Sequence, residues 1–204
     1  ADHNVAVGGQ ALSTDTLGSR SVAIGQHALQ TQNFTSATNA YNVAVGYDAG
    51  VSVTTGTQNT LIGGLAGDAL TTGGGNVAVG YSSLTTATTG VNNTALGISS
   101  LHLNTTGSLN TANGYQSLYA NTTGGENVAI GDRAMATNTT GGNNTSIGSF
   151  ALRFNTTASN NTAVGYSALT ANTTGTRNTA VGMSAGAAIT TGSYNVLMGA
   201  YTGD

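Results

Sequence analysis

Residues 161–177 read NTAVGYSALTANTTGTR, and this pattern recurs along the whole chain of 204 residues. Aligned on its opening motif, Asn-(Val/Thr)-Ala-(Val/Ile)-Gly, the chain contains twelve copies, six of which depart from the motif at one or two residues. Successive copies start 17 residues apart, as at Asn144, Asn161 and Asn178, except that the step from Ser21 to Asn42 is 21 residues. A fixed internal period of this kind is typical of solenoids. We number the repeat from its Asn, so that Asn161 is position 1 and Arg177 is position 17.

The period and composition of the repeat predict an all-β fold. Seventeen residues are too few for a helical hairpin, and glycine and β-branched residues disfavour helices. We expect a β-solenoid (a parallel β-roll) of about twelve turns, forming a single domain over residues 1–204. Each turn is expected to hold one strand at positions 1–4 and a second around the Ala-Leu pair at positions 8 and 9, with Thr-Thr-Gly closing the coil. The four extra residues are expected to loop out within about residues 30–40.

Stacking places the same repeat position of successive coils above one another. The Asn at position 1 is expected to form a ladder, in which each side-chain amide bonds to the amides above and below. The Gly at position 5 permits a positive φ or a close approach of the neighbouring backbone. The predicted ladder residues are Asn42, Asn59, Asn76, Asn93, Asn110, Asn127, Asn144, Asn161 and Asn178, with Gly46, Gly63, Gly80, Gly97, Gly114, Gly131, Gly148, Gly165 and Gly182. A row of Asn that binds a ligand is the alternative.

The composition disfavours several partners and chemistries. Four Arg and no Lys cannot supply the clusters that neutralise phosphates, so nucleic acid is not expected. No run approaches the roughly 20 apolar residues of a membrane span, so no membrane insertion is expected. His3, His27 and His102 lie in distant turns, and only Glu126 and Asp132 among the acidic residues are near each other in sequence. We therefore predict no enzyme, with no catalytic residues, no metal and no cofactor.

The first strand is apolar on both faces. Positions 2 and 4, as in Val128 and Ile130, point one way, and position 3, as in Ala129, points the other way. If Ala lines the interior, an apolar strip of Val, Ile and Thr lies outside and marks an interface with further copies. The alternative is a monomer in which Val and Leu fill the coil. Asn113 replaces Val or Ile at position 4, either to fix the register of associated chains or as a tolerated surface residue.

Variable positions could carry binding specificity because the fold does not dictate them. A candidate surface binding edge, suited to stacking on sugars, comprises His102, Tyr119, Arg153 and Phe154 around position 10. Ordinary surface variation is the alternative. Candidate glycan acceptors begin Asn-x-Thr triplets at position 12, namely Asn104, Asn121, Asn138, Asn155 and Asn172. These triplets also follow simply from a Thr-rich turn.

The runs NVAVGYDAG (42–50), NVAIGDRAMATNTTG (127–141) and NTAVGYSALTANTTG (161–175) resemble known repeats. They are similar to the head repeats of trimeric autotransporter adhesins and, more closely, to repeat arrays in viral tail fibres and related appendages. The resemblance covers essentially the whole chain. It implies a left-handed roll, three chains side by side, and attachment at a cell or virion surface.

These observations predict a structural and adhesive protein. We expect the rigid rod of a trimeric attachment fibre, extracellular or on a virion, that contributes to binding a carbohydrate or protein receptor. A self-assembling extracellular filament, with coils stacked end to end, is one alternative. An ice-binding solenoid is another, although adjacent Thr residues leave only one outward Thr file per turn.

Overall fold

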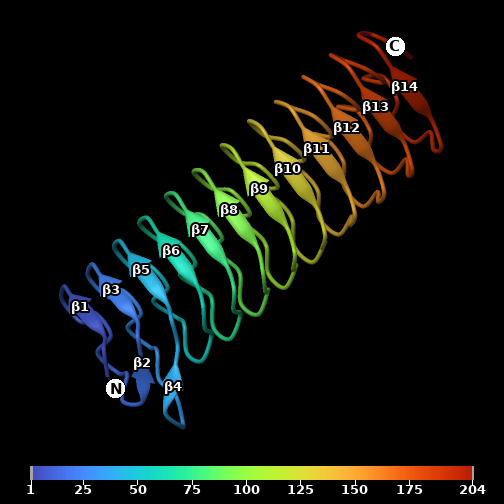
Figure 1. Ribbon diagram of the computed structural model, residues 1–204. Coiled ribbons are helices and arrows are strands. Elements are labelled where there is room, and N and C mark those ends of the chain that lie inside the picture. Colours follow the sequence, from blue (N-terminus) through green and yellow to red (C-terminus); the bar gives the residue numbers. More distant parts are fainter. Residues whose placement is uncertain (1, 204) are drawn as a thin grey trace.

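The computed structural model describes residues 2–203 as a straight rod of stacked coils, with the two ends of the chain at opposite ends of the rod (Figure 1). No helix occurs among these residues. Each coil contributes one strand to the main sheet: β1 Val5–Val7, β3 Val22–Ile24, β5 Val43–Val45, β6 Thr60–Ile62, β7 Val77–Val79, β8 Thr94–Leu96, β9 Thr111–Asn113, β10 Val128–Ile130, β11 Thr145–Ile147, β12 Thr162–Val164, β13 Thr179–Val181 and β14 Val196–Met198.

The main sheet has twelve strands that pair in parallel and without any shift of the repeat. Val128 of β10 pairs with Thr145 of β11, and the same position-to-position match holds along the sheet. Neighbouring strands in a sheet lie about 4.8 Å apart, so eleven spacings give a sheet about 53 Å long. The predicted β-solenoid is therefore confirmed.

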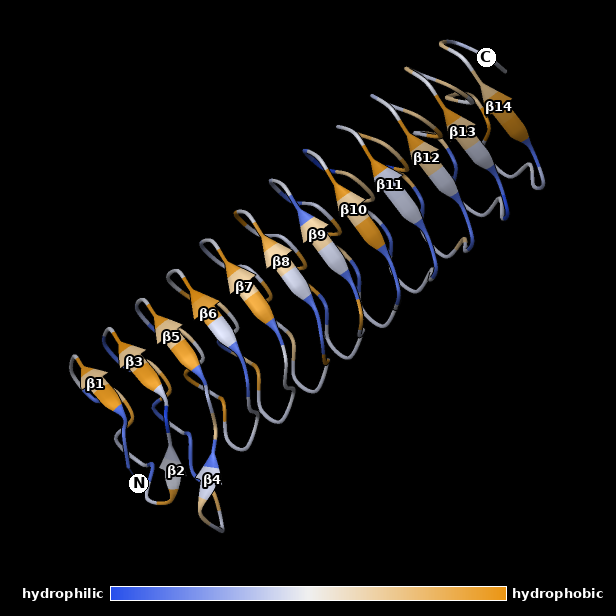
Figure 2. Ribbon diagram, in the orientation of Figure 1, coloured by the Kyte–Doolittle hydropathy of each residue, from blue (hydrophilic) through white to orange (hydrophobic). Residues whose placement is uncertain are grey.

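The interior of each coil is narrow and is filled by small side chains and one larger one. Ala129 at position 3, Ala134 at position 8 and Met135 at position 9 are all completely buried. Val128 and Ile130 point outward, and Figure 2 shows hydrophobic residues along the main sheet, with paler stretches in β6, β8, β9 and β11–β13. Ala thus lines the coil. The alternative in which Val fills the interior and Ala is exposed is wrong, although the Leu residues at position 9 are buried.

The expected second strand around the Ala-Leu pair does not form. In the coil that begins at Asn161, this segment is a run of turns, with positive φ at Ser167 (54°) and Leu169 (49°). Hydrogen bonds within the coil, such as Asn172 N to Leu169 O at 3.1 Å, alternate with bonds to the next coil, such as Leu169 N to Ala185 O at 3.0 Å. The left-handed backbone conformation is unfavourable for residues other than glycine, so the sequence does not predict it at these positions.

Glycine at position 5 is required by both conformation and space. Gly165 has a φ of 137°, and a Cβ at this residue would lie 2.4 Å from the carbonyl oxygen of Gly182 in the next coil. Both reasons expected from the sequence for this glycine therefore apply here.

The second coil is longer than the others and projects at one end of the rod (Figure 1). Short strands β2 (Gly18–Ser19) and β4 (Thr38–Asn39) pair in parallel beside the main sheet. Asn33 N donates to Thr54 O, at the same repeat position of the next coil. The main sheet resumes its register at β5, where Val43 pairs with Val22. The additional residues therefore lie after Asn33 and before β5.

Candidate functional site

A ladder of asparagine side chains runs inside the coil at position 1. The Nδ2 of Asn127 donates to Asn110 Oδ1 at 3.1 Å, and the Oδ1 of Asn127 accepts the backbone N–H of Asn144 at 3.0 Å. The backbone bond to the preceding side chain repeats along the file from Asn42 to Asn195. Because these amides are internal and engaged with one another, the row is structural and not a ligand surface.

A second ladder, at position 12, was not expected as such. The Nδ2 of Asn138 donates to Asn121 Oδ1 at 2.8 Å, and equivalent bonds join the whole file. Its members are the candidate glycan acceptors Asn104, Asn121, Asn138, Asn155 and Asn172, and all five are completely buried. Their assignment as acceptors is wrong for the folded chain, because an enzyme could not reach amides that are enclosed and hydrogen-bonded. The recurrence of Asn at position 12 of consecutive coils was the available signal.

The two ladders converge on one carbonyl in each of five coils. Asn127 Nδ2 donates to Gly141 O at 2.9 Å, and Asn138 Nδ2 donates to the same oxygen at 3.0 Å. A carbonyl oxygen has two lone pairs, so both bonds can form together. The turn before each new strand is thereby tied to both files of side chains.

In the coil that lacks Asn at position 1, a glutamine side chain makes hydrogen bonds in its place. Ser21 is too short to continue the ladder, and the fully buried Gln32 takes over its contacts. Gln32 Oε1 accepts a bond from Asn42 Nδ2 at 2.8 Å, and Gln32 Nε2 donates to Ser21 Oγ at 3.3 Å. Gln32 was not recognised from the sequence, because it lies eleven residues from the position that it supports.

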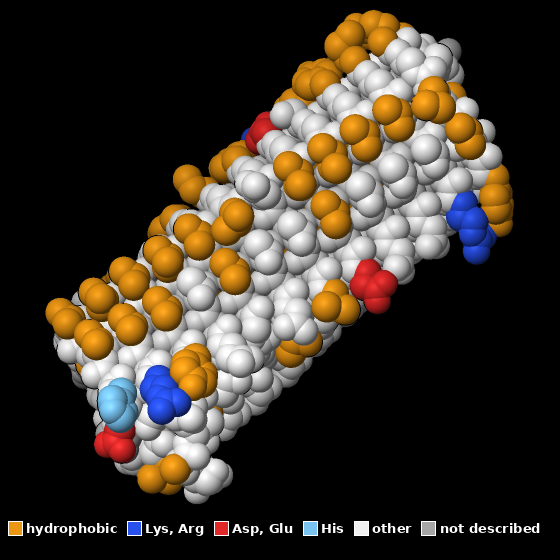
Figure 3. All heavy atoms as spheres, in the orientation of Figure 1, with side chains coloured by type: hydrophobic (Ala, Val, Ile, Leu, Met, Phe, Trp, Pro, Cys, Tyr) orange, Lys and Arg blue, Asp and Glu red, His pale blue; other side chains and the backbone are white. Residues whose placement is uncertain are grey.

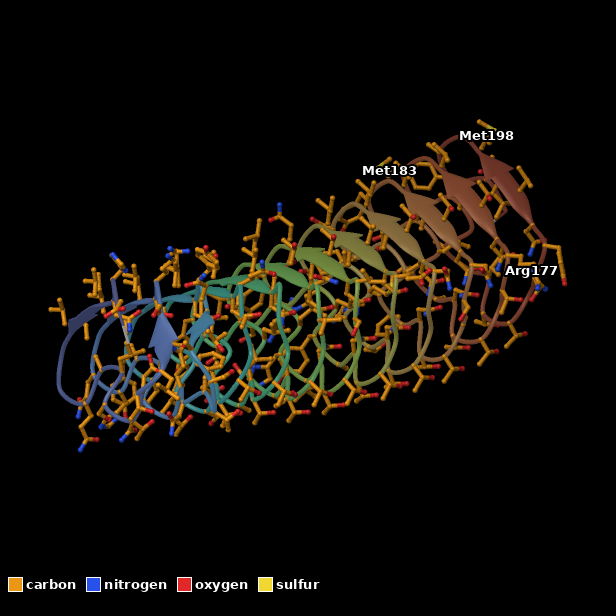
Figure 4. All side chains as sticks on the ribbon, turned by 60° about the horizontal axis from the view of Figure 1, so that its bottom comes forward. Arg177, Met183 and Met198 are labelled. Carbon is orange, nitrogen blue, oxygen red and sulfur yellow. The ribbon has the colours of Figure 1, made fainter. Side chains whose placement is uncertain are left out.

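The apolar strip is the file of position 2 and position 4 side chains on the outer face of the main sheet. Figure 3 shows rows of hydrophobic side chains along this face. In Figure 4, Met198 at position 4 of β14 and Met183 at position 6 stand outside the coil, whereas Arg177 projects from a different edge. Ile130 and Ile147 are 37% and 38% exposed although both are large apolar residues. The strip continues over all twelve strands and contains no charged residue.

Asn113 interrupts this strip. It lies at position 4 of β9, paired in the sheet with Leu96 and Ile130, and its side chain is exposed. No side-chain hydrogen bond of Asn113 is found within residues 2–203. Its amide is therefore free to bond outside the chain.

The structure places the residues of the candidate binding edge in two groups. His102 and Tyr119 stack with their ring centroids 5.0 Å apart and an interplanar angle of 6°. Two coils beyond Tyr119, the Cζ of Arg153 lies 5.0 Å from the ring centroid of Phe154 and 5.2 Å from that of Phe150. Phe150 also packs edge-on against Tyr166. Phe150 is a member that sequence reasoning missed, because position 7 gave no reason to connect it with position 10.

Catalytic and metal-binding groups do not gather in the part of the chain that the structure describes. Among these residues no group of three His, Asp or Glu could hold a metal ion, and no helix could cross a membrane. A shallow groove of about 380 Å³ lies between Thr106 and Asn143, with Glu126 as its only titratable side chain. His27 Nδ1 and Asp48 Oδ1 lie within hydrogen-bonding distance, 2.8 Å apart.

The carboxylate of Asp68 lies in an unfavourable environment. Asp68 lies at position 10, and its Oδ1 is buried without a hydrogen-bond partner. Burial raises the pKa of Asp68, and the nearby negative charge of Asp48 raises it further. Backbone N–H groups and His102 act in the opposite direction without cancelling the increase.

Acidification should therefore stabilise the fold at Asp68. A folded-state pKa above the unfolded one means that the folded chain binds the proton more tightly. The contribution of this carboxyl to stability rises as the pH falls through the raised pKa, and levels off below its ordinary value of 3.8. We expect Asp68→Asn to raise the melting temperature at pH 7, with a gain that shrinks towards pH 4. Glu126→Gln, on the exposed face, removes the same charge and should give no comparable gain; an equal gain would contradict the role of burial.

Comparison with known proteins gives no match to a family model, to a curated protein or to a solved structure.

Proposed function

We propose that this chain is the rigid rod of a trimeric attachment fibre, extracellular or on a virion surface, and that it has no catalytic activity. The observation that carries the proposal is the uncharged apolar strip, which runs along all twelve strands while the core of the coil is already closed by Ala and Leu. The residues with catalytic chemistry are dispersed, so the supported role is mechanical. A stiff column of cross-bonded coils would hold a receptor-binding region away from the surface that bears it.

Further copies of the same chain are the partner that suits this strip. From position 2 to position 6 a coil spans about 13 Å, so this face measures about 53 by 13 Å, or about 700 Å². Positions 2 and 4 are uncharged, and the flanking position 6 carries one charge, at Asp132. The area is close to the roughly 800 Å² that each partner contributes to a stable two-chain interface, and in a trimer each chain divides the face between two neighbours. Identical chains lying in parallel would match the strip in register, coil against coil. Three copies would bring Asn113 amides together, where they could bond to one another and fix that register.

The solution mass of the native particle tests this proposal. By light scattering after size exclusion, we expect three times the chain mass of 20.0 kDa. The double variant Ile130→Lys/Ile147→Lys should dissociate to single chains with an unchanged circular dichroism spectrum, because it places charges in the strip. The control Thr123→Lys/Thr140→Lys adds the same charge at exposed position 14 and should remain trimeric. A native mass equal to that of one chain would contradict the proposal, and large polydisperse particles would support the filament instead.

Ice binding is less well supported by the threonine geometry. Thr105 at position 13 donates its hydroxyl to Thr122 O at 2.9 Å, and most other residues in this file make the same bond. Of the adjacent Thr pair, only position 14 is left exposed, as a single file. An absence of thermal hysteresis would remove this alternative.

A further inference from the structure

Arg153 differs from the other three arginines of the chain. Arg20 and Arg177 donate hydrogen bonds to the hydroxyls of Tyr41 and Tyr194, and Arg133 donates to Gln116. Within residues 2–203, the guanidinium of Arg153 has no hydrogen-bond or ion-pair partner. Its cationic N–H groups are thus unpaired in a chain that has few cations.

Two aromatic rings hold the guanidinium of Arg153. Phe150 and Phe154 flank it at 5.2 and 5.0 Å, and Phe154 is itself 45% exposed. Such contacts are favourable and restrict the guanidinium, and they do not satisfy its N–H groups. An arginine that is restricted in this way presents a planar fork of donors, which matches a carboxylate with two parallel hydrogen bonds.

The same edge offers a ring surface beside this fork. His102 covers one face of Tyr119. The next residue of the file on the other side is Ala136, which has only a methyl group, and then comes Arg153. Two coil spacings, about 9.5 Å, therefore separate Tyr119 from Arg153 across a small residue. A pyranose could stack its apolar face on the open side of Tyr119 while a ring carboxylate reaches Arg153.

We propose that Tyr119, Ala136 and Arg153 form a binding site for a saccharide that carries a carboxylate, such as a uronic or sialic acid. The site would supply the class of ligand to which the proposed fibre attaches, so this inference rests on the proposed function. It lies at position 10, outside the apolar strip at positions 2 and 4.

Calorimetric titration of the native particle tests the site with matched ligands. The probes are trigalacturonate against its neutral methyl ester, and sialyllactose against lactose. We expect the acidic member of at least one pair to bind at least tenfold more tightly than the neutral one. Arg153→Gln should abolish this preference, and Tyr119→Ala should weaken binding of the acidic saccharide at least fivefold. Arg177→Gln removes the same charge from another edge and should leave the affinity within twofold.

Several results would overturn the proposal. These are no binding of either acidic saccharide, equal binding of the neutral partners, acetate binding as tightly as the saccharides, or an equal loss with Arg177→Gln. The mass of the same sample and its circular dichroism are measured alongside. A trimer without acidic-saccharide binding would overturn this site alone, whereas a saccharide-binding monomer would overturn the trimeric fibre and leave the site.

Discussion

Asn127→Ala is expected to lower the free energy of unfolding by about 3 kcal/mol or more, because it leaves buried polar groups without partners. The substitution removes the acceptor of the Asn144 backbone N–H, which lies 3.0 Å from Asn127 Oδ1. It also removes one of the two bonds to Gly141 O and the bond to Asn110. Each coil is bonded only to its neighbours, so the damage should be local as well as large.

Denaturant unfolding and hydrogen exchange together measure this effect. Exchange should accelerate most in β10 and β11, on either side of the missing bond. Asn138→Ala breaks the second ladder without orphaning a backbone N–H, and we expect a smaller loss. Asn143→Gly removes an exposed asparagine at a residue with a φ of 58°, a conformation that glycine also adopts, and should change stability by less than about 0.5 kcal/mol. Equal losses for Asn127→Ala and Asn143→Gly would show that the ladder does not stabilise the fold.

The strand and its ladder could be predicted because the repeat determines them directly. A position that recurs in every repeat must stack, so Asn at position 1 and Gly at position 5 had few other arrangements open to them. The inward or outward choice for Val128 and Ala129 could not be decided, because period-two alternation fixes two faces without saying which face is enclosed. The narrow coil decides it, since only a small side chain such as alanine fits opposite the Leu at position 9.

The turns and the binding edge could not be predicted for different reasons. Leu169 adopts a left-handed conformation that its own side chain disfavours, and only the stacked coils impose it. Phe150 and Arg153 meet because this run of turns brings positions 7 and 10 together. A strand-like reading of the repeat does not predict that contact. The Asn at position 12 was visible as a recurring residue, but its triplet with Thr suggested glycosylation more readily than burial.

Glycine at position 9 is a further feature that the sequence displays without explaining. Gly67 takes the place of the usual Leu and has a φ of 57°, close to the 54° of Leu84 in the next coil. A Cβ at Gly67 would lie 2.8 Å from Leu61 Cδ2, and one at Gly50 would lie 2.7 Å from Leu61 Cδ1. Leu61 occupies position 3, where most coils have Ala. Here the large side chain that fills the interior is therefore Leu61 at position 3, and Gly50 and Gly67 at position 9 leave space for it.

Gly67→Leu should consequently be among the most destabilising single substitutions in the rod, by about 3 kcal/mol, because two leucines would then compete for one space. Leu61→Ala alone should cost about 2–5 kcal/mol by leaving a cavity. The double variant restores the usual arrangement at both positions, and its backbone needs no change, so we expect it to recover about 2 kcal/mol or more relative to the sum of the single losses. Gly64→Ala is the control, because a Cβ there meets Tyr81 at an ordinary 3.5 Å and nothing closer. Additive losses in urea unfolding would mean that Leu61 and Gly67 do not share one space, whereas strong coupling would show that the coil tolerates a large residue on either side of its interior but not on both.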